Sequence, residues 1–220
     1  MNEPVRILCV FGSLERGGAE TMCMNIYRRV DRERLQFDFV KHTPEKCAYE
    51  DEIKVLGGRV YTAPRFKLYN IFSYKKWWEN HLKAHPEHKV IHGHYFTISK
   101  FYFQVAKKMG RVTVGHCHVA DLRHTFKASI RRLIDRNTEN YCDFCLACSK
   151  QSGGLFFTNR EFTVVNNGIE PEKFHFNEEA RNKMRKEFGI EQNFVIGVVG
   201  SIKESKNPFE TIKIFKAVLK

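Results

Sequence analysis

Short apolar runs typical of β-strands recur through the first three quarters of the chain. They lie at residues 5–12, 37–42, 58–64, 89–96, 111–118, 143–149 and 161–168. Segments with helical spacing separate most of these runs, and we expect helices at about 22–30, 50–58, 73–85, 99–109 and 126–140. Strands that alternate with helices are joined by right-handed crossovers and form a parallel sheet. The pattern therefore predicts a doubly wound, Rossmann-like α/β domain.

The pattern changes after this domain. Residues 169–193 are mostly charged and fit a connecting turn followed by a short helix. An apolar strand is then expected at 193–201 and a helix at 207–220, which Asn207 and Pro208 open. One strand and one helix cannot bury the edges of their own sheet. We therefore expect a first domain at 1–176, a linker with a connecting helix at 177–192, and the start of an incomplete second domain at 193–220.

The net charge of the chain, 37 − 25 = +12, favours an anionic partner such as nucleic acid, a membrane surface or a phosphorylated substrate. The basic residues are spread over many predicted helices and no nucleic-acid-binding motif occurs, so nucleic acid is not expected. No apolar run resembles a signal peptide or a membrane span. The seven cysteines, an odd number, lie mostly in apolar segments and favour reduced thiols. We expect a cytoplasmic protein.

A glycine-rich stretch, FGSLERGGAE at 11–20, follows the first predicted strand. Gly12, Gly17 and Gly18 can adopt positive φ and allow a ligand close to the backbone, and the amides that open the next helix attract a phosphate. The Walker A and G-x-G-x-x-G motifs are not matched, which disfavours a nucleoside triphosphatase or a dinucleotide oxidoreductase. The alternative is a glycine-rich turn without a ligand.

His116 and His118 end a strand in the middle of the predicted sheet, where open α/β sheets bind their ligands. A histidine there can hydrogen-bond a sugar hydroxyl or accept its proton. The spacing also places both imidazoles on one strand face, as a zinc site would require, but no other ligand pair is clearly directed at them. We therefore predict no metal. His92 and His94 repeat the pattern and either line the same crevice or pack inside the domain.

Cys142, Cys145 and Cys148 have a spacing found in iron–sulfur loops. They are interleaved with apolar residues in a strand-like run, which favours buried structural thiols. The sequence Asn166-Asn167-Gly168 predicts a turn at the exit from the first domain.

Five segments of the chain together resemble glycosyltransferase family 4, the retaining, nucleotide-sugar-dependent enzymes of GT-B architecture. They occur in the order of the family and are GGAE (17–20), VGHCH (114–118), LACSK (146–150), VVNNGIEPEKF (164–174) and GVVGSIKESKNPF (197–209). The resemblance covers nearly the whole chain as the amino-terminal portion of such an enzyme. The HCH sequence and the ACS strand look most like the capsular and exopolysaccharide branch.

The resemblance implies a crevice between two Rossmann-like domains, the first binding mainly the acceptor and the second the nucleotide-sugar. No cofactor is expected, because the donor, a UDP-sugar, is a substrate. The amides of Gly17 and Gly18 would face a phosphate of the donor or acceptor, and His118 or His116 would position a sugar hydroxyl. Lys206 would stabilise the departing diphosphate. Ser201 stands where the family commonly has an arginine, so one expected cation is missing there and Lys203 is a substitute.

The family's paired-glutamate motif and nucleotide pocket lie downstream of Lys220. We therefore expect the chain to be an excerpt or a natural truncation of a retaining hexosyltransferase, inactive by itself. The alternative is a non-catalytic half-module that binds the acceptor or a membrane and needs a donor-domain partner. A lipid-linked acceptor would place the protein at the inner membrane face, in keeping with the positive charge and an aromatic group. That group consists of Phe66, Tyr69, Phe72, Trp77 and Trp78, and the alternative for it is ordinary core packing.

Overall fold

The computed structural model describes residues 3–94, 98–118, 136–200, 202 and 206–219. Two compact units make up the chain, Met1–Glu170 and Pro171–Lys220. The predicted helix at 126–140 falls largely outside the described residues, which show a short 3-10 helix at Thr138–Tyr141 instead.

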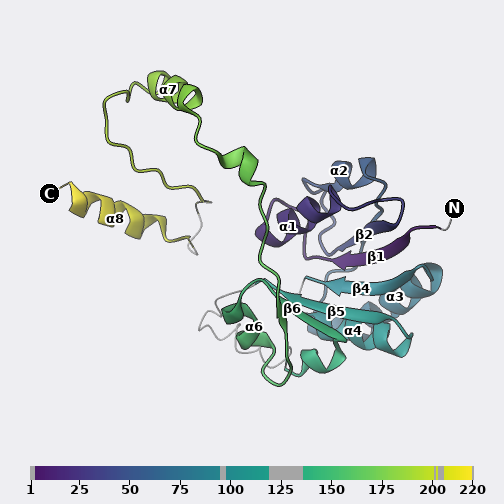
Figure 1. The fold of residues 1–220 in the computed structure, drawn as a ribbon. Coiled ribbons are helices and arrows are strands. Elements are labelled where there is room, and N and C mark those ends of the chain that lie inside the picture. The colour runs from purple at the N-terminus through teal and green to yellow at the C-terminus, as the bar shows by residue number, and fades with distance from the viewer. Residues whose placement is uncertain (1–2, 95–97, 119–135, 201, 203–205, 220) are drawn as a thin grey trace. The chain divides into compact units, whose positions relative to one another are not determined.

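The first unit contains one parallel sheet whose strands follow the order β3-β2-β1-β4-β5-β6-β7 (Figure 1). The strands are β1 (Val5–Val10), β2 (Leu35–Lys41), β3 (Val60–Thr62), β4 (His88–Gly93), β5 (Val112–Cys117), β6 (Phe144–Ala147) and β7 (Thr163–Val164). Each lies within one of the predicted apolar runs or within two residues of it, and all pairs are parallel. The predicted doubly wound α/β fold is confirmed. Because the chain winds outward from β1 to β3 and then returns to β4, the winding direction switches between β1 and β4.

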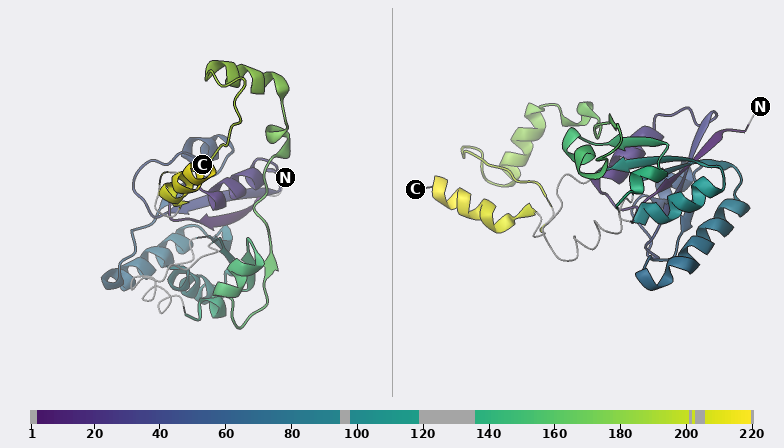
Figure 2. Two further views of the ribbon diagram at one scale, coloured as in Figure 1. Left: turned by 90° about the vertical axis from the view of Figure 1, so that its left-hand side faces the viewer. Right: turned by 90° about the horizontal axis from the view of Figure 1, so that it is seen from below.

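Helices connect these strands on both faces of the sheet. They are α1 (Gly18–Tyr27), α2 (Glu50–Val55), α3 (Ile71–Ala84), α4 (Ser99–Lys108) and α6 (Lys150–Phe156), together with a short 3-10 helix at Leu68–Asn70. Helices α3 and α4 lie side by side (Figures 1 and 2). Alternate residues of β1, together with the residue that follows it, face two separate cores. Leu8 and Val10 pack with α3 and α4, whereas Cys9 and the following Phe11 pack with α1 and α2.

The sequence pattern did not predict helix α6. Its segment contains two adjacent glycines, which lower helix propensity. The helix begins because the Ser149 side chain caps it, accepting a hydrogen bond from the Ser152 amide at 3.0 Å. Gly153 leaves room for the Phe162 ring, which a Cβ atom at this position would overlap. Tertiary packing therefore determines this helix.

A buried carboxylate joins three strands of the sheet. Asp38 on β2 has no exposed surface, and it accepts hydrogen bonds from Arg6 on β1 at 2.7 Å and from His88 on β4 at 2.8 Å. The Arg59 amide donates a third at 2.8 Å. Burial alone would raise the pKa of Asp38, but these donors and the charge of Arg6 hold it below its usual value. Asp38 is thus an ionised structural group.

The aromatic residues around α3 divide between core and surface. Trp78 is completely buried, and Phe66 and Trp77 pack against the core, so the alternative of ordinary core packing holds for these three residues and membrane contact does not. The buried positions of α3 include Tyr74, Trp78 and Leu82, which recur every four residues on one face of the helix. Tyr69 and Phe72 are exposed, at 80% and 88% of their surface.

The described residues of the second unit form two helices and connecting segments. The helices are α7 (Glu178–Glu187) and α8 (Pro208–Val218), preceded by a 3-10 helix at Pro171–Phe174. The strand expected at 193–201 is not formed within the described residues 193–200, and Phe194 and Val199 there are almost fully exposed. A strand is stabilised by hydrogen bonds to a neighbour, and the described part of this unit offers none. The predicted boundaries at 176 and 192 stay predictions.

The cysteines are free thiols. Cys142 and Cys145 are buried and Cys148 is half-buried, and none of the three belongs to a group of potential metal ligands among the described residues. Within the same residues, no helix is long and apolar enough to cross a bilayer.

Candidate active site

Four histidines gather at the carboxyl ends of β4 and β5, next to the point where the winding direction switches. His92 and His116 lie within these strands, and His94 and His118 directly follow them. The register pairs His92 with Val114 and Gly93 with Gly115, so that the histidines of the two strands become neighbours. The sequence predicted that His116 and His118 end a strand in the middle of the sheet, and the parallel order places them there, one strand away from the switch point.

The imidazole rings form one continuous cluster. His94 Nδ1 and His118 Nε2 lie 2.9 Å apart, a hydrogen-bonding distance. The ring centroids are 4.1 Å apart for His92 and His94 and 4.1 Å for His116 and His118, and His92 stacks on His116 at 5.5 Å. Phe11, which follows β1, stacks on His94 with centroids 4.4 Å apart and planes 5° from parallel. The ring of Phe11 thereby fixes the orientation of His94.

Burial keeps these rings in their neutral form. Desolvation, together with the smaller effect of the neighbouring histidines, lowers the pKa of His92 to about 4 and of His116 to about 3. The same cause lowers the pKa of His94 well below its usual value. Burial also lowers the pKa of His118 to about 4, although Asn167 beside it acts in the opposite direction. Near pH 7 each ring therefore offers both a donor and an acceptor nitrogen.

Several ring nitrogens of the cluster are buried and lack a hydrogen-bond partner among the described residues. They are His92 Nε2, His94 Nε2, both nitrogens of His116, and His118 Nδ1. A buried polar atom without a partner costs about 1–3 kcal/mol. The concentration of such atoms at one place makes this part of the domain the candidate for contact with a ligand.

Asn167 connects the histidine cluster to the glycine-rich stretch. Its side chain interacts with His118, and its Nδ2 lies 3.6 Å from the position that a Cβ atom would take at Gly18. The turn predicted at Asn166-Asn167-Gly168 is not formed; the segment continues past β7 without regular structure. The sequence analysis assigned no role to Asn167. The one sequence signal for Asn167 was its place in the Asn166-Asn167-Gly168 segment, at the predicted exit from the first domain.

Gly17 and Gly18 begin helix α1, as predicted, but with different contacts. Neither has positive φ, so the expected left-handed backbone is wrong here. The Gly17 amide donates to the carbonyl of Glu15 at 2.7 Å, and the carboxylate of Glu20 covers Gly17. The amides of Gly18 and Ala19 have no backbone acceptor among the described residues. The Gly18 amide is therefore a candidate donor to an anion, whereas the Gly17 amide already donates to Glu15.

Glu20 occupies the space expected for a phosphate. Its carboxylate interacts with its own amide at the start of α1, which lowers its pKa, but burial has the larger effect and raises the pKa above the usual value. Glu15 nearby also raises it. The site thus already holds an acidic group next to the helix amides, and sequence reasoning did not identify it.

The two remaining predicted site residues belong to the second unit. Ser201 lies outside the described residues, as does Lys203. Lys206 is exposed and its Cγ lies 4.0 Å from the Cβ position at Gly200. The roles of Ser201 and Lys206 stay predictions.

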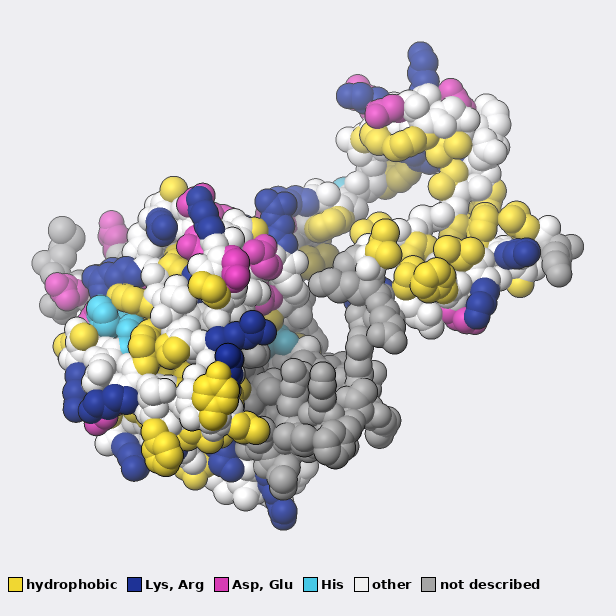
Figure 3. Space-filling model, turned by 180° about the vertical axis from the view of Figure 1, so that it is seen from behind, with side chains coloured by type: hydrophobic (Ala, Val, Ile, Leu, Met, Phe, Trp, Pro, Cys, Tyr) yellow, Lys and Arg dark blue, Asp and Glu magenta, His cyan; other side chains and the backbone are white. Residues whose placement is uncertain are grey.

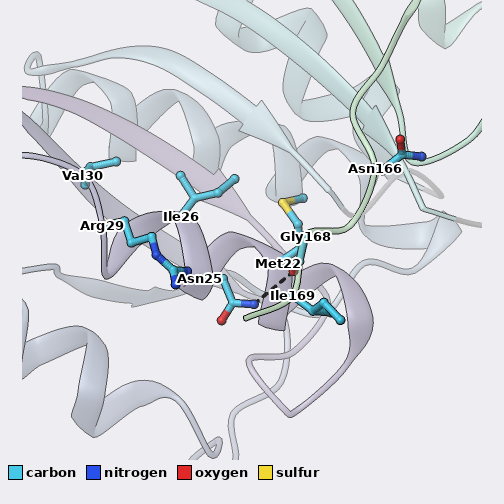
Figure 4. Close-up of a pocket in the computed structure, with 8 residues that line it drawn as sticks. All are labelled: Met22, Asn25, Ile26, Arg29, Val30, Asn166, Gly168 and Ile169. Atoms are coloured by element: carbon cyan, nitrogen blue, oxygen red, sulfur yellow. Dashed lines mark hydrogen bonds between the residues drawn. The ribbon is translucent and has the colours of Figure 1, made fainter. Parts of the chain in front are cut away.

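A cavity of about 360 Å³ lies on α1, apart from the residues predicted for the site. Met22, Asn25, Ile26 and Arg29 line it from the helix, and the segment after β7 closes it (Figure 4). Asn25 Nδ2 donates to the Gly168 carbonyl at 3.1 Å, which is the dashed line in Figure 4. Its walls are mainly apolar, so the polar chemistry of the domain lies in the histidine cluster and not in this groove.

A parallel, doubly wound sheet defines a Rossmann-like α/β protein, the class in which ligands generally bind at the carboxyl ends of the strands, where the unpartnered histidine nitrogens of the described residues lie. Comparison with known sequences identifies the family. The sequence profile of Glycosyltransferase Family 4 matches residues 16–173, so the chain belongs to that family.

Known proteins support this assignment. The chain is 32% identical over 223 aligned residues to a Bacillus subtilis (strain 168) protein described as "Putative glycosyltransferase EpsF", covering 95% of this chain and 57% of the relative. Crystal structures of Anabaena HepE with UDP and with UDP-glucose superpose with TM-scores of 0.69 at 17% and 18% identity, covering 91% and 90% of this chain and 54% of HepE. A glycosyltransferase of Rickettsia africae ESF-5 gives 0.57 at 15% identity, with 86% of this chain and 50% of that one covered. The chain thus spans little more than half the length of these proteins.

Proposed function

We propose that the protein takes part in polysaccharide biosynthesis as the acceptor-side portion of a retaining hexosyltransferase, which moves a sugar from a UDP-sugar to a saccharide or lipid-linked acceptor. The observation that carries the proposal is the group of unpartnered imidazole nitrogens at the switch point, adjoining the open amide of Gly18. The similarity to EpsF supports the polysaccharide pathway. The HepE structures with UDP and UDP-glucose support the donor class.

In this proposal, His118 contacts a hydroxyl of the acceptor. It is half-buried, and its Nδ1 is among the unpartnered nitrogens. The hydrogen bond to His94 and the stacking of His94 on Phe11 hold it in place. His116 is almost completely buried and orients the neighbouring rings. Precise placement of a hydroxyl lowers the barrier to transfer because the orientation is provided before the reaction.

Gly18 supports a phosphate at the start of α1. Its backbone does not need positive φ, and a Cβ atom there would meet only ordinary contact with Asn167. The fold therefore does not require glycine at position 18. A ligand that approaches the helix amides does require glycine there, because a side chain would shield the amides. Lys206 would then stabilise the negative charge on the departing diphosphate.

The test is ligand binding combined with a transfer assay. We expect thermal stabilisation of the 220-residue chain by phosphorylated acceptor analogues such as a short polyprenyl phosphate in detergent, because a ligand of the native state raises its melting temperature. His118→Ala should abolish the shift, and His85→Ala, a half-buried histidine outside the cluster, should not. No sugar transfer from UDP-sugars is expected from this chain by itself. Transfer by the chain, or binding that His118→Ala leaves intact, contradicts the proposal.

A second candidate is a non-catalytic module that binds an anionic membrane surface and needs a partner with a donor domain. Exposed Tyr69 and Phe72 favour it, and Lys67 Nζ lies 5.3 Å from the Tyr69 ring centroid. Figure 3 shows basic and hydrophobic side chains interspersed on one face of the molecule, rather than a single basic stripe.

Vesicle sedimentation distinguishes this candidate. Phe72→Ser combined with Tyr69→Ser should release the chain from vesicles that contain anionic lipid. Val55→Ser is the matched control, since Val55 is equally exposed, at 86%, on helix α2. Equal loss of binding in both variants, or equal binding to zwitterionic vesicles, contradicts membrane docking at this place.

A further inference from the structure

We propose that His94, His116 and His118 form a binding site for a divalent transition-metal ion such as Zn²⁺. The site does not depend on the proposed transfer reaction, because it rests on the arrangement of three side chains. The sequence argued against a metal, since His116 and His118 lacked a third ligand directed at them. The register of β4 and β5 supplies that ligand by placing His94 beside them.

The three rings are close to a metal-binding arrangement. One nitrogen from each of His94, His116 and His118 lies within 4.8 Å of the other two. In a tetrahedral zinc site, nitrogens that bind at about 2.0–2.1 Å lie roughly 3.3 Å from one another. His94 Nδ1 and His118 Nε2 are already closer than this, at 2.9 Å. Small rotations of the rings therefore suffice to place all three nitrogens around one ion.

Unpartnered nitrogens provide an independent reason for a ligand here. His94 Nε2, His118 Nδ1 and both nitrogens of His116 are buried without a hydrogen-bond partner in the described part of the chain. When His94 Nδ1 and His118 Nε2 bind a metal, the proton that now joins them moves to another ring nitrogen, and both imidazoles stay neutral. The ion thus replaces one hydrogen bond by three metal–nitrogen bonds.

The ligand chemistry selects the class of ion. Imidazole nitrogen suits Zn²⁺, Ni²⁺, Co²⁺ and Cu²⁺, whereas Mg²⁺ and Ca²⁺ require oxygen ligands. No carboxylate belongs to this group among the described residues. Three histidines leave a fourth position for water, as in zinc sites that exchange ligands. His118 is half-exposed, which gives the ion access from solvent.

A neighbouring group, Cys9 with His92 and His94, has a similar spacing. Cys9 has no exposed surface, and its Sγ accepts a hydrogen bond from the Cys23 thiol at 3.9 Å. An ion at that place would have to separate the two thiols inside the core formed by α1 and β1. We therefore assign the ion to the three-histidine group, with His94 as the residue that the two groups share.

The test is metal binding by the full 220-residue chain without a histidine tag. After equilibrium dialysis against Zn²⁺, we expect one zinc ion per chain by elemental analysis. Cobalt should substitute and give the visible absorption of a site with nitrogen ligands. His116→Gln and His118→Gln should each weaken zinc binding by more than about tenfold. Loss of a residue that only hydrogen-bonds to a metal ligand already costs about tenfold or more, and loss of the ligand itself should cost more than that. His85→Gln should bind zinc like the original chain, because His85 lies outside both groups.

Each other outcome overturns the assignment. Zinc content near zero, or zinc binding that neither substitution weakens, excludes the three-histidine site. A sulfur-to-cobalt charge-transfer band places the ion at Cys9 instead. His116 is buried, so its substitution can disturb the fold. His118 is half-exposed, so His118→Gln tests the site without that risk, and circular dichroism should show an unchanged fold.

Discussion

His94 and His118 lie 24 residues apart in the chain, yet their imidazoles meet at 2.9 Å. The contact depends on the parallel pairing of β4 with β5, which aligns the ends of the two strands. A shift of register by one residue would turn the side chains of one strand to the opposite face of the sheet and separate the rings. The histidine cluster therefore depends on the register of β4 and β5.

Gly18→Ala should impair ligand binding without impairing the fold. A Cβ atom at this position meets only Asn167 Nδ2, at an ordinary 3.6 Å. Alanine at a helical position also reduces the entropy of the unfolded chain and stabilises by about 0.4–1 kcal/mol. We expect an unchanged or higher melting temperature and a weaker thermal shift with phosphorylated ligands. A lower melting temperature would show that the glycine is structural.

Glu20→Gln should strengthen the binding of phosphate-containing ligands. The carboxylate covers Gly17 at the start of α1, where it repels an incoming anion. Removal of its charge should not lower the stability of the fold, because burial raises the pKa of Glu20 by more than the helix start lowers it. Titration with UDP or inorganic pyrophosphate measures the effect, with Glu33→Gln as an exposed control. Equal or weaker binding by Glu20→Gln argues against an anion site here.

Asp38→Asn should be among the most destabilising conservative changes in the chain. Asparagine keeps one acceptor oxygen, but it removes the negative charge that pairs with Arg6 and puts an NH2 group in place of the other oxygen, which His88 or Arg6 contacts. Loss of one partner from a buried ion pair costs about 3–5 kcal/mol. Urea unfolding provides the measurement. Asp51→Asn is the matched control, because its ion pair with Lys46 is exposed to solvent, and it should leave the unfolding midpoint nearly unchanged. Similar losses in the two variants would contradict the structural role of Asp38.

The adjacent glycines of α6 should respond in opposite directions to alanine. At Gly153 a Cβ atom would overlap the Phe162 ring, so Gly153→Ala should destabilise by about 1–3 kcal/mol. At Gly154 nothing lies within 4 Å, so Gly154→Ala should stabilise the helix by about 0.5–1 kcal/mol. Thermal unfolding of the two single variants measures both effects. The same sign for both changes would show that α6 does not pack on Phe162.

Stability should fall as the pH decreases from about 6.5 to 4, partly through His42. Burial lowers the pKa of His42 to about 4, although its hydrogen bond to the Phe11 carbonyl at 2.8 Å opposes the shift. In this range the unfolded chain binds a proton that the folded chain does not, so the free energy of unfolding decreases as the pH falls. The share of His42 is on the order of 2 kcal/mol between about pH 7 and pH 5.

His42→Gln isolates this share in urea unfolding at the two pH values. The histidine cluster acts in the same direction in the variant and the original chain, so the difference between their pH slopes belongs to His42. The variant should lose less stability on acidification than the original chain. Identical slopes would mean that His42 is protonated as readily in the folded state as in the unfolded state.

Local sequence features identified much of the domain correctly and failed where distant residues decide the outcome. The apolar runs predicted the seven strands, and the central strands are apolar because they bury alternate side chains on both faces of the sheet. The aromatic residues near α3 are alike in type, so composition cannot tell which are buried. Trp78 is buried and Phe72 is exposed because they lie on different faces of the helix. The run at 193–201 has the composition of a strand, but strand formation requires a partner that the described residues do not provide.

The chain's own sequence determined the alternation of strands and helices, the placement of His116 and His118 at a strand end, and the glycines that open α1, because these follow from nearest neighbours and periodicity. The tertiary structure alone decided that His94 meets His118, that Asn167 lies between His118 and Gly18, and that Glu20 covers Gly17. These contacts join segments far apart in the chain or depend on a side-chain conformation. No local pattern encodes them, since sheet register and packing fix them only when the whole domain has folded.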